Sequence, residues 1–183
     1  MAQINKPTDY FNTVLWSGNS TDNTAITTGH ATDFIWSKIR GFTYSHRLAD
    51  SVRGASKTLF SDKTDAESSD PCYRSFDNDG FTLGTDGGTN ASGNTYVGWS
   101  WLAGGTGVSN TDGSITSTVS ANTTSGFSIV SYTSDGNSGA TVGHGLGVAP
   151  SVVIVKRRSS AEDWGVGHQS LGCLLYTSPS PRD

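Results

Sequence analysis

The stretch that decides the fold is Asp33-Phe34-Ile35-Trp36-Ser37-Lys38-Ile39-Arg40, an apolar run closed by Lys-x-Arg. The same plan returns 118 residues later as Ser151-Val152-Val153-Ile154-Val155-Lys156-Arg157-Arg158. Short runs rich in β-branched and aromatic residues, bounded by turn residues, are typical of buried strands. Because one pattern occurs twice, the sequence predicts two successive folding units, each with its own core.

A second pair of segments supports this duplication. Residues 11–16 (Phe-Asn-Thr-Val-Leu-Trp) and 127–132 (Phe-Ser-Ile-Val-Ser-Tyr) are both predicted strands followed by turn-rich sequence. Their offset is 116 residues, and a loop that differs by two residues explains the difference. A Gly-His pair, Gly29-His30 or Gly143-His144, precedes each organising stretch. We interpret both pairs as strand-entry turns, since a metal site needs further ligands.

The segment Tyr96-Val97-Gly98-Trp99-Ser100-Trp101 alternates strictly. Residues two apart share one face of a strand, so the pattern predicts that Val97, Trp99 and Trp101 face the core and that Tyr96 faces the opposite way. The large rings favour this assignment, because tryptophan gains much by burial. Residues 57–61 and 81–84 are further predicted strands, and residues 85–94 are a predicted loop.

These segments predict an all-β fold, an antiparallel β-sandwich of jelly-roll-like form, followed by a truncated second copy. The expected organisation is an N-terminal lead (1–9), a complete repeat (10–103), a Gly/Ser/Thr-rich connector (104–125), the truncated repeat (126–172) and a tail (173–183). Within the connector, residues 114–120 are expected to form an edge strand or a plain link.

Composition narrows the functional classes. Charged residues make up 15% of the chain, glycine occurs 23 times and the net charge is −4. A weakly charged, polar surface without clusters of basic residues offers no electrostatic binding surface for nucleic acid or an anionic membrane. No apolar run approaches the length of a spanning helix or a signal-peptide core, so neither membrane insertion nor export by its own signal is expected.

The sequence offers no recognisable catalytic, cofactor-binding or metal-binding motif. Asp77-Asn78-Asp79-Gly80 begins like a calcium loop but has Gly88 at the twelfth position, so a turn is expected. Cys72 is expected to be a packed or half-exposed thiol. Asp50 and Arg53 are expected to form a local ion pair that caps a turn. We therefore predict a protein that is not an enzyme and has no cofactor.

The last eleven residues, Cys173 to Asp183, resemble the translation of a common transposase-based sequencing adapter, residue for residue. We exclude this segment from fold reasoning as a scar unrelated to the natural protein. The natural chain is then expected to be longer, cut after about Gly172.

Several motifs together resemble a known group of repeats. They are Tyr-Phe-x-x-x-x-Trp-x-Gly-Asn near the start, residues 33–40, Asp50-Ser51-Val52-Arg53-Gly54, residues 80–84, residues 90–97, residues 126–130 and residues 142–150. The pattern is similar to the repeats of tail-associated, tail-fibre-like virion proteins of marine bacteriophages. The resemblance implies a long virion polypeptide of β-rich repeats, sometimes with a concanavalin-like lectin module elsewhere.

The resulting expectation is a structural component of a phage virion, a spacer or host-surface adhesion module found on the particle and outside the cell after release. Its expected partners are other virion subunits, a host-surface glycan and further copies of itself. Trp36 and Tyr96 are the candidates for glycan contact. One alternative is a lectin-like carbohydrate-binding module, which would carry an exposed aromatic ring beside Asn or Asp. Another is a glycoside hydrolase or depolymerase, which would need two carboxylates ~5–10 Å apart in a cleft.

Overall fold

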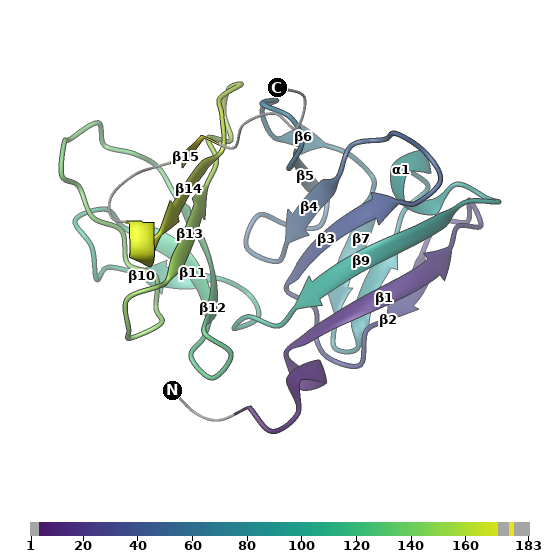
Figure 1. Cartoon of the computed structure of the whole chain (residues 1–183), viewed down its shortest axis with the longest axis horizontal. Helices are drawn as coiled ribbons and strands as arrows, with labels where there is room; N and C mark the ends of the chain where they lie inside the picture. The colour runs from purple at the N-terminus through teal and green to yellow at the C-terminus, as the bar shows by residue number, and fades with distance from the viewer. Residues whose placement is uncertain (1–3, 172–175, 178–183) are drawn as a thin grey trace.

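The computed structural model describes residues 4–171 and 176–177. Strands dominate it, and Figure 1 shows them in two regions, with β1 to β9 on the right and β10 to β15 on the left. The elements are η1 (Pro7–Asp9), β1 (Phe11–Ser17), β2 (Thr24–Thr27), β3 (Phe34–Ile39), β4 (Arg47–Asp50), β5 (Lys57–Phe60), β6 (Ser68–Ser69), β7 (Tyr73–Asp77), β8 (Gly80–Leu83), α1 (Gly87–Asn90), β9 (Thr95–Trp101), β10 (Val108–Asn110), β11 (Ser117–Asn122), β12 (Phe127–Tyr132), β13 (Val152–Val155), β14 (Gly165–His168), η2 (Gln169–Leu171) and β15 (Tyr176–Thr177).

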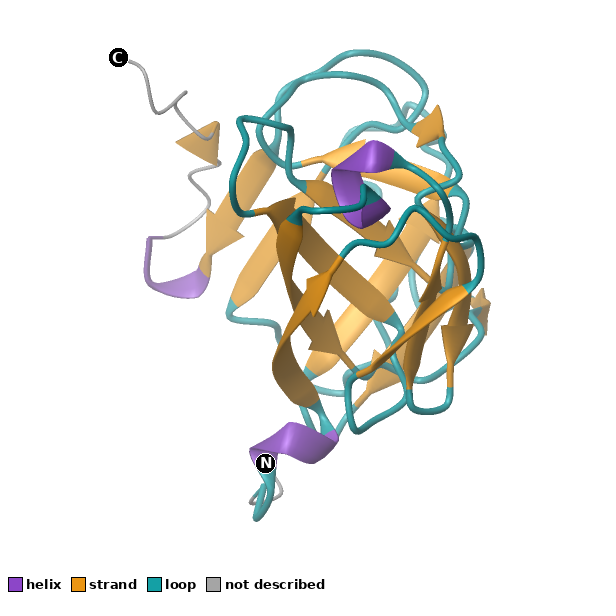
Figure 2. Ribbon diagram, turned by 90° about the vertical axis from the view of Figure 1, so that its right-hand side faces the viewer, coloured by secondary structure: helices purple, strands orange, loops and turns teal. Residues whose placement is uncertain are grey.

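The first region is a two-layer sandwich. A six-stranded sheet has the order β1-β9-β3-β4-β5-β6, and a three-stranded sheet has the order β2-β8-β7. Strands from both sheets contribute the buried cluster Trp16, Ile35, Ile39, Ala49, Cys72, Tyr73, Phe81, Leu83 and Tyr96. Figure 2 shows the layered strands from the side. The predicted all-β, antiparallel sandwich is confirmed.

The predicted orientation of β9 was wrong. Tyr96, Gly98 and Ser100 are buried on the core face, whereas Trp99 and Trp101 lie on the outer face and are only half-buried. Ring size alone suggested the reverse, because each large side chain would gain by burial. Two features of the core, the space it leaves and the polar partners it supplies, decide the orientation instead.

Space at the centre of β9 is occupied by side chains from its neighbours. A Cβ atom at Gly98 would lie 2.9 Å from both Ile35 Cδ1 and Trp16 Cζ3. Tyr96 stacks on Trp16 with ring centroids 5.5 Å apart, and its hydroxyl donates to the Gly87 carbonyl at 2.9 Å. The same hydroxyl accepts from the Ala91 amide at 2.8 Å. A buried phenol needs such partners, and the loop after β8 supplies them.

The second region contains two small sheets, β10-β11-β12 and β13-β14-β15. Strands β10 and β11 lie inside the expected connector 104–125, and β11 is the middle strand of its sheet. The expectation of an edge strand or plain link was therefore wrong. Ser120 explains part of this placement, because its hydroxyl accepts from the Gly104 amide at 2.9 Å and donates to the Gly105 carbonyl. This folds the Gly-rich stretch back against β11.

The second region packs onto the first. Phe127 of β12 lies 5.8 Å from the Phe34 ring and 5.9 Å from the Trp101 ring, measured between centroids. Trp164 donates from Nε1 to the Phe60 carbonyl at 3.0 Å. These contacts join residues that lie between 26 (Trp101 and Phe127) and 104 (Phe60 and Trp164) positions apart in the sequence.

The two organising stretches both form strands, and each pairs in the same way with the strand that follows. In β3 and β4 the register runs from Phe34↔Asp50 to Ser37↔Arg47. In β13 and β14 it runs from Val152↔His168 to Val155↔Gly165. Every residue pair of the first ladder thus has a counterpart shifted by 118 residues on both strands.

The surroundings of the two stretches differ. Strand β3 lies inside its sheet between β9 and β4, and Ile35 is fully buried. Strand β13 ends its sheet, and its four residues are all exposed, Ile154 by 62%. A duplication predicts the shared register. It does not predict that β13 is an exposed edge strand, because β3 lies inside its sheet.

Several finer predictions are confirmed. Strands form at residues 11–17, 57–60, 80–83 and 127–132, and Asp77–Gly80 closes the hairpin between β7 and β8. Strands β2, β4, β6, β7, β10 and β14 were missed, and the predicted loop 85–94 contains the single turn α1. Within the described residues no helix is long and apolar enough to cross a membrane. Most of the predicted adapter-derived tail, residues 173–175 and 178–183, lies outside the described residues.

Candidate functional site

The outer face of the six-stranded sheet carries a ladder of large apolar side chains. The register aligns Phe11 with Trp101 and Trp101 with Phe34, and one step along it aligns Thr13, Trp99 and Trp36. Because these residues alternate with the core residues, all of them point away from the three-stranded sheet. We call Phe11, Leu15, Trp36, Trp99 and Trp101 the aromatic strip.

The second region covers one end of the aromatic strip and leaves the other end open. Phe127 packs on Trp101, which pairs with Phe11 at the covered end, whereas Trp36 is 37% exposed and Leu15 is 64% exposed. Trp36 and Trp99 face each other with centroids 5.8 Å apart and planes tilted by 58°. The open end is therefore a pair of indole rings at the surface, a chemistry enriched where proteins bind partners.

A lysine shares the face of β3 that carries Trp36. Lys38 is two residues beyond Trp36 on the same face of β3. Its ammonium group donates to the carbonyls of Ile39 at 2.7 Å and Phe42 at 2.6 Å, which anchors the side chain at the sheet end. Flat rings beside a fixed donor can contact both the apolar face and the hydroxyl groups of a sugar.

The two residues predicted to contact a glycan lie on opposite faces. Trp36 is 37% exposed, although its strand β3 lies inside the sheet and not at an edge. Tyr96 is fully buried, and burial raises the pKa of its hydroxyl although the Ala91 amide opposes the shift. The prediction for Tyr96 was wrong because β9 is inverted relative to its expected orientation. Trp99, which sequence reasoning assigned to the core, takes the surface place beside Trp36.

Asp50 and Arg53 form the predicted capped turn. The Asp50 carboxylate accepts from the Val52 amide at 3.1 Å and the Arg53 amide at 2.8 Å, and Arg53 Nε donates to it at 2.5 Å. Arg53 also binds Glu67 at 3.0 Å, and Glu67 binds Arg158 from beyond β13 at 2.8 Å. Asp50, Arg53, Glu67 and Arg158 thus form an ionic bridge between the two regions.

Glu67 is the shared acid of this ionic bridge. Burial would raise the pKa of its carboxyl group, but hydrogen bonds from Arg158 and Arg53 outweigh burial and hold the pKa below its ordinary value. Glu67 is therefore ionised at neutral pH. The charged side chains of the ionic bridge pair with one another and hold the two regions together, so their role is structural.

Cys72 is packed in the core. It is fully buried, and Arg47 Nε donates to its sulfur at 3.1 Å. Burial raises the pKa of the thiol to about 11, although the Arg47 charge opposes the shift. Because the thiolate is the nucleophilic form, this sulfur is held in its unreactive form.

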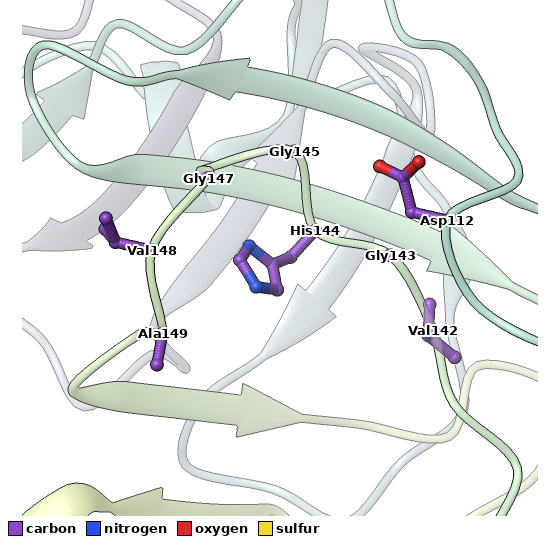
Figure 3. A pocket seen from close by; sticks show the side chains of 8 residues that line it. All are labelled: Asp112, Val142, Gly143, His144, Gly145, Gly147, Val148 and Ala149. Carbon is purple, nitrogen blue, oxygen red and sulfur yellow. The ribbon is translucent and has the colours of Figure 1, made fainter.

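A hollow of about 570 Å³ lies beside the segment that leads into β13. Figure 3 shows the residues that line it, with the His144 ring pointing into the space between β12 and β13. Asp112 is the one carboxylate among these lining residues. In the described part of the chain no group of three His, Cys, Asp or Glu side chains is placed to hold a metal ion.

Sequence reasoning missed Trp99, Leu15 and Lys38 as surface residues. The signal was present in Gly98 and Ser100, since small residues alternating with tryptophan can mark the side of a strand that large neighbours cover. The alternation determines the orientation of β9 only together with the positions of Trp16 and Ile35. In the structure both side chains pack over Gly98.

The fold and the outer face define an all-β sandwich protein that carries a partly open aromatic strip. The chain belongs to a family described as domain of unknown function DUF7483, whose sequence model matches residues 6–178. This match spans both regions and extends into the segment 173–183. No curated protein and no solved structure matches the chain.

Proposed function

We propose that this chain is a structural module of a bacteriophage particle, tail-fibre-like or otherwise tail-associated, that adheres to host-surface glycan through the aromatic strip. The observation that carries the adhesive role is the exposed Trp36, whose ring lies against the half-buried Trp99 on an open sheet face. Exposed indole rings are costly to keep in water, and they are typical of surfaces that bind.

The assignment to a virion rests on sequence. The motifs at residues 33–40, 50–54, 80–84 and 142–150 resemble repeats of tail-associated virion proteins. The weakly charged surface and the antiparallel sandwich suit a rigid spacer that presents loops and a sheet face. Antibodies raised against the chain should label purified particles, and unlabelled particles would contradict the assignment.

The glycan assignment rests on the chemistry of the open face. Two indole rings offer apolar area to a sugar ring, and the Lys38 ammonium group lies at the same sheet end as a donor. Such a site needs no catalytic group, which distinguishes a binding module from a depolymerase. The alternative function is a carbohydrate-binding, lectin-like module. It would use the same surface to bind glycan.

A glycan array with the full chain tests the proposal. We expect binding that is lost or weakened at least about tenfold, or about 1.4 kcal/mol, in Trp36→Ala. Tyr132→Ala is the matched control, because Tyr132 is an aromatic residue of similar exposure (43%) on β12. A wild-type protein that binds no glycan, or a Trp36→Ala variant that binds as well as wild type, would overturn the adhesive role.

A further inference from the structure

Strands β12 and β13 each end their sheet. Strand β12 pairs with β11 and β13 pairs with β14, and neither has a second partner among the described strands. Figure 3 shows β12 and β13 running in the same direction, with the segment that carries His144 leading from one to the other. A strand lying between them would run antiparallel to both.

The first region shows what fills the equivalent position. There β9 lies between β1 and β3 and is antiparallel to both. By position in the sequence, β12 corresponds to β1 and β13 corresponds to β3, and the β3–β4 ladder recurs in β13–β14 with a shift of 118 residues. Among the described strands, none lies between β12 and β13 in the position that β9 takes between β1 and β3.

Exposure points to the same position. Val152, Val153, Ile154 and Val155 are 51%, 45%, 62% and 40% exposed, so both faces of β13 are open to water. Their counterparts in β3 include Ile35, which is fully buried against β9 and the core. An unpaired edge with four consecutive exposed β-branched residues is a template for strand addition.

His144 supplies an independent observation. In the first region His30, of the Gly-His pair that resembles Gly143-His144 without aligning exactly with it, approaches Ser100 of β9, with Nε2 and Oγ 3.3 Å apart. His144 uses Nδ1 to accept from the Leu146 amide at 3.2 Å, and its ring points toward the gap between β12 and β13. An incoming strand with serine at the Ser100 position would meet it there.

We propose that the gap between β12 and β13 is a strand-acceptor site. Its occupant is an extended polypeptide segment from outside the described residues, with the alternation of β9: large apolar or aromatic residues facing one way, and small residues with one tyrosine facing the other. Main-chain hydrogen bonds to both edges supply affinity, and the alternation supplies register. This site goes beyond the adhesive role, which uses the other region.

The test is a fluorescein-labelled peptide with the sequence of residues 94–103, flanked by lysines for solubility, titrated into the full chain by anisotropy. We expect saturable binding of one peptide per chain. Val153→Lys should weaken it at least about tenfold, because a charged side chain on an exposed edge strand disfavours the pairing of an apolar strand. Val108→Lys, at an exposed position of β10, is the control and should bind like wild type.

Three results would overturn the proposal. The peptide fails to saturate, a peptide of the same composition with shuffled order binds equally well, or the protein alone forms a dimer in which β13 is already paired. The last result would make a second copy of the chain the occupant. Each is separable from the glycan test, because Trp36 and the aromatic strip are unchanged in these variants.

Discussion

Tyr96 and Trp36 lie on neighbouring strands but serve opposite purposes. Tyr96 is held in the core by its ring stack on Trp16 and by two hydrogen bonds of its hydroxyl. Trp36 lies on the outer face with its ring against Trp99. Trp36 pairs with Trp99, three residues along β9 from Tyr96, so the Tyr96 and Trp36 side chains lie on opposite faces of the sheet.

Tyr96→Phe should destabilise the protein by about 1–3 kcal/mol, because it leaves the Gly87 carbonyl and the Ala91 amide without their buried partner. Urea unfolding followed by fluorescence measures the change. The control Tyr132→Phe removes an exposed hydroxyl and should stay within about 0.5 kcal/mol of wild type. Equal stability of Tyr96→Phe and wild type would show that the phenol is not buried as described.

Local pattern predicted which residues form strands better than it predicted which face they present. Residues 127–132 and 11–17 form strands because their β-branched and aromatic content suits a pleated surface. The face of β9 depended on Trp16 and Ile35, which come from distant strands, so alternation alone did not determine it. The Asp50–Arg53 turn was predictable because its contacts are local.

At the scale of elements, the ionic bridge joins the loop before β6 to the segment after β13. Glu67 binds Arg53 on one side and Arg158 on the other, and its amide donates to the Arg158 carbonyl at 2.9 Å. Sequence reasoning had no access to this contact, because it joins residues 91 positions apart. Long-range partners of this kind decide how the two regions pack.

The ionic bridge should make stability depend on pH. The folded pKa of Glu67 lies below the unfolded value of about 4.3. Its contribution is therefore present above pH ~4.3 and is lost as the pH falls through the folded pKa. Thermal unfolding of wild type should show this loss, whereas Glu67→Gln should be less stable by about 1–3 kcal/mol at pH 7 and less sensitive to acid.

Asp65→Asn is the matched control for Glu67→Gln. Asp65 lies in the same loop and pairs with Lys63 at 3.7 Å, but both side chains are about half exposed. An exposed pair contributes little, so this variant should follow the wild-type pH profile. If Glu67→Gln also followed it, the bridge would not hold the regions together.

At the scale of the whole molecule, the chain consists of a complete sandwich and a second region that repeats part of its strand pairing. The first region has both layers and a closed core. The second region shares the β3–β4 register but leaves β13 exposed. The proposed adhesive surface belongs to the first region and the proposed strand-acceptor site to the second, so the two proposals can be tested separately.

Amide hydrogen exchange, measured residue by residue by NMR on the full chain without peptide, tests this account most directly. In β3, which has partners on both edges, all amides should exchange slowly. In β13 only the alternate amides that point to β14 should be protected, and those that point toward β12 should exchange quickly. Uniform protection of β13 equal to that of β3 would contradict the account, because the edge would already be paired.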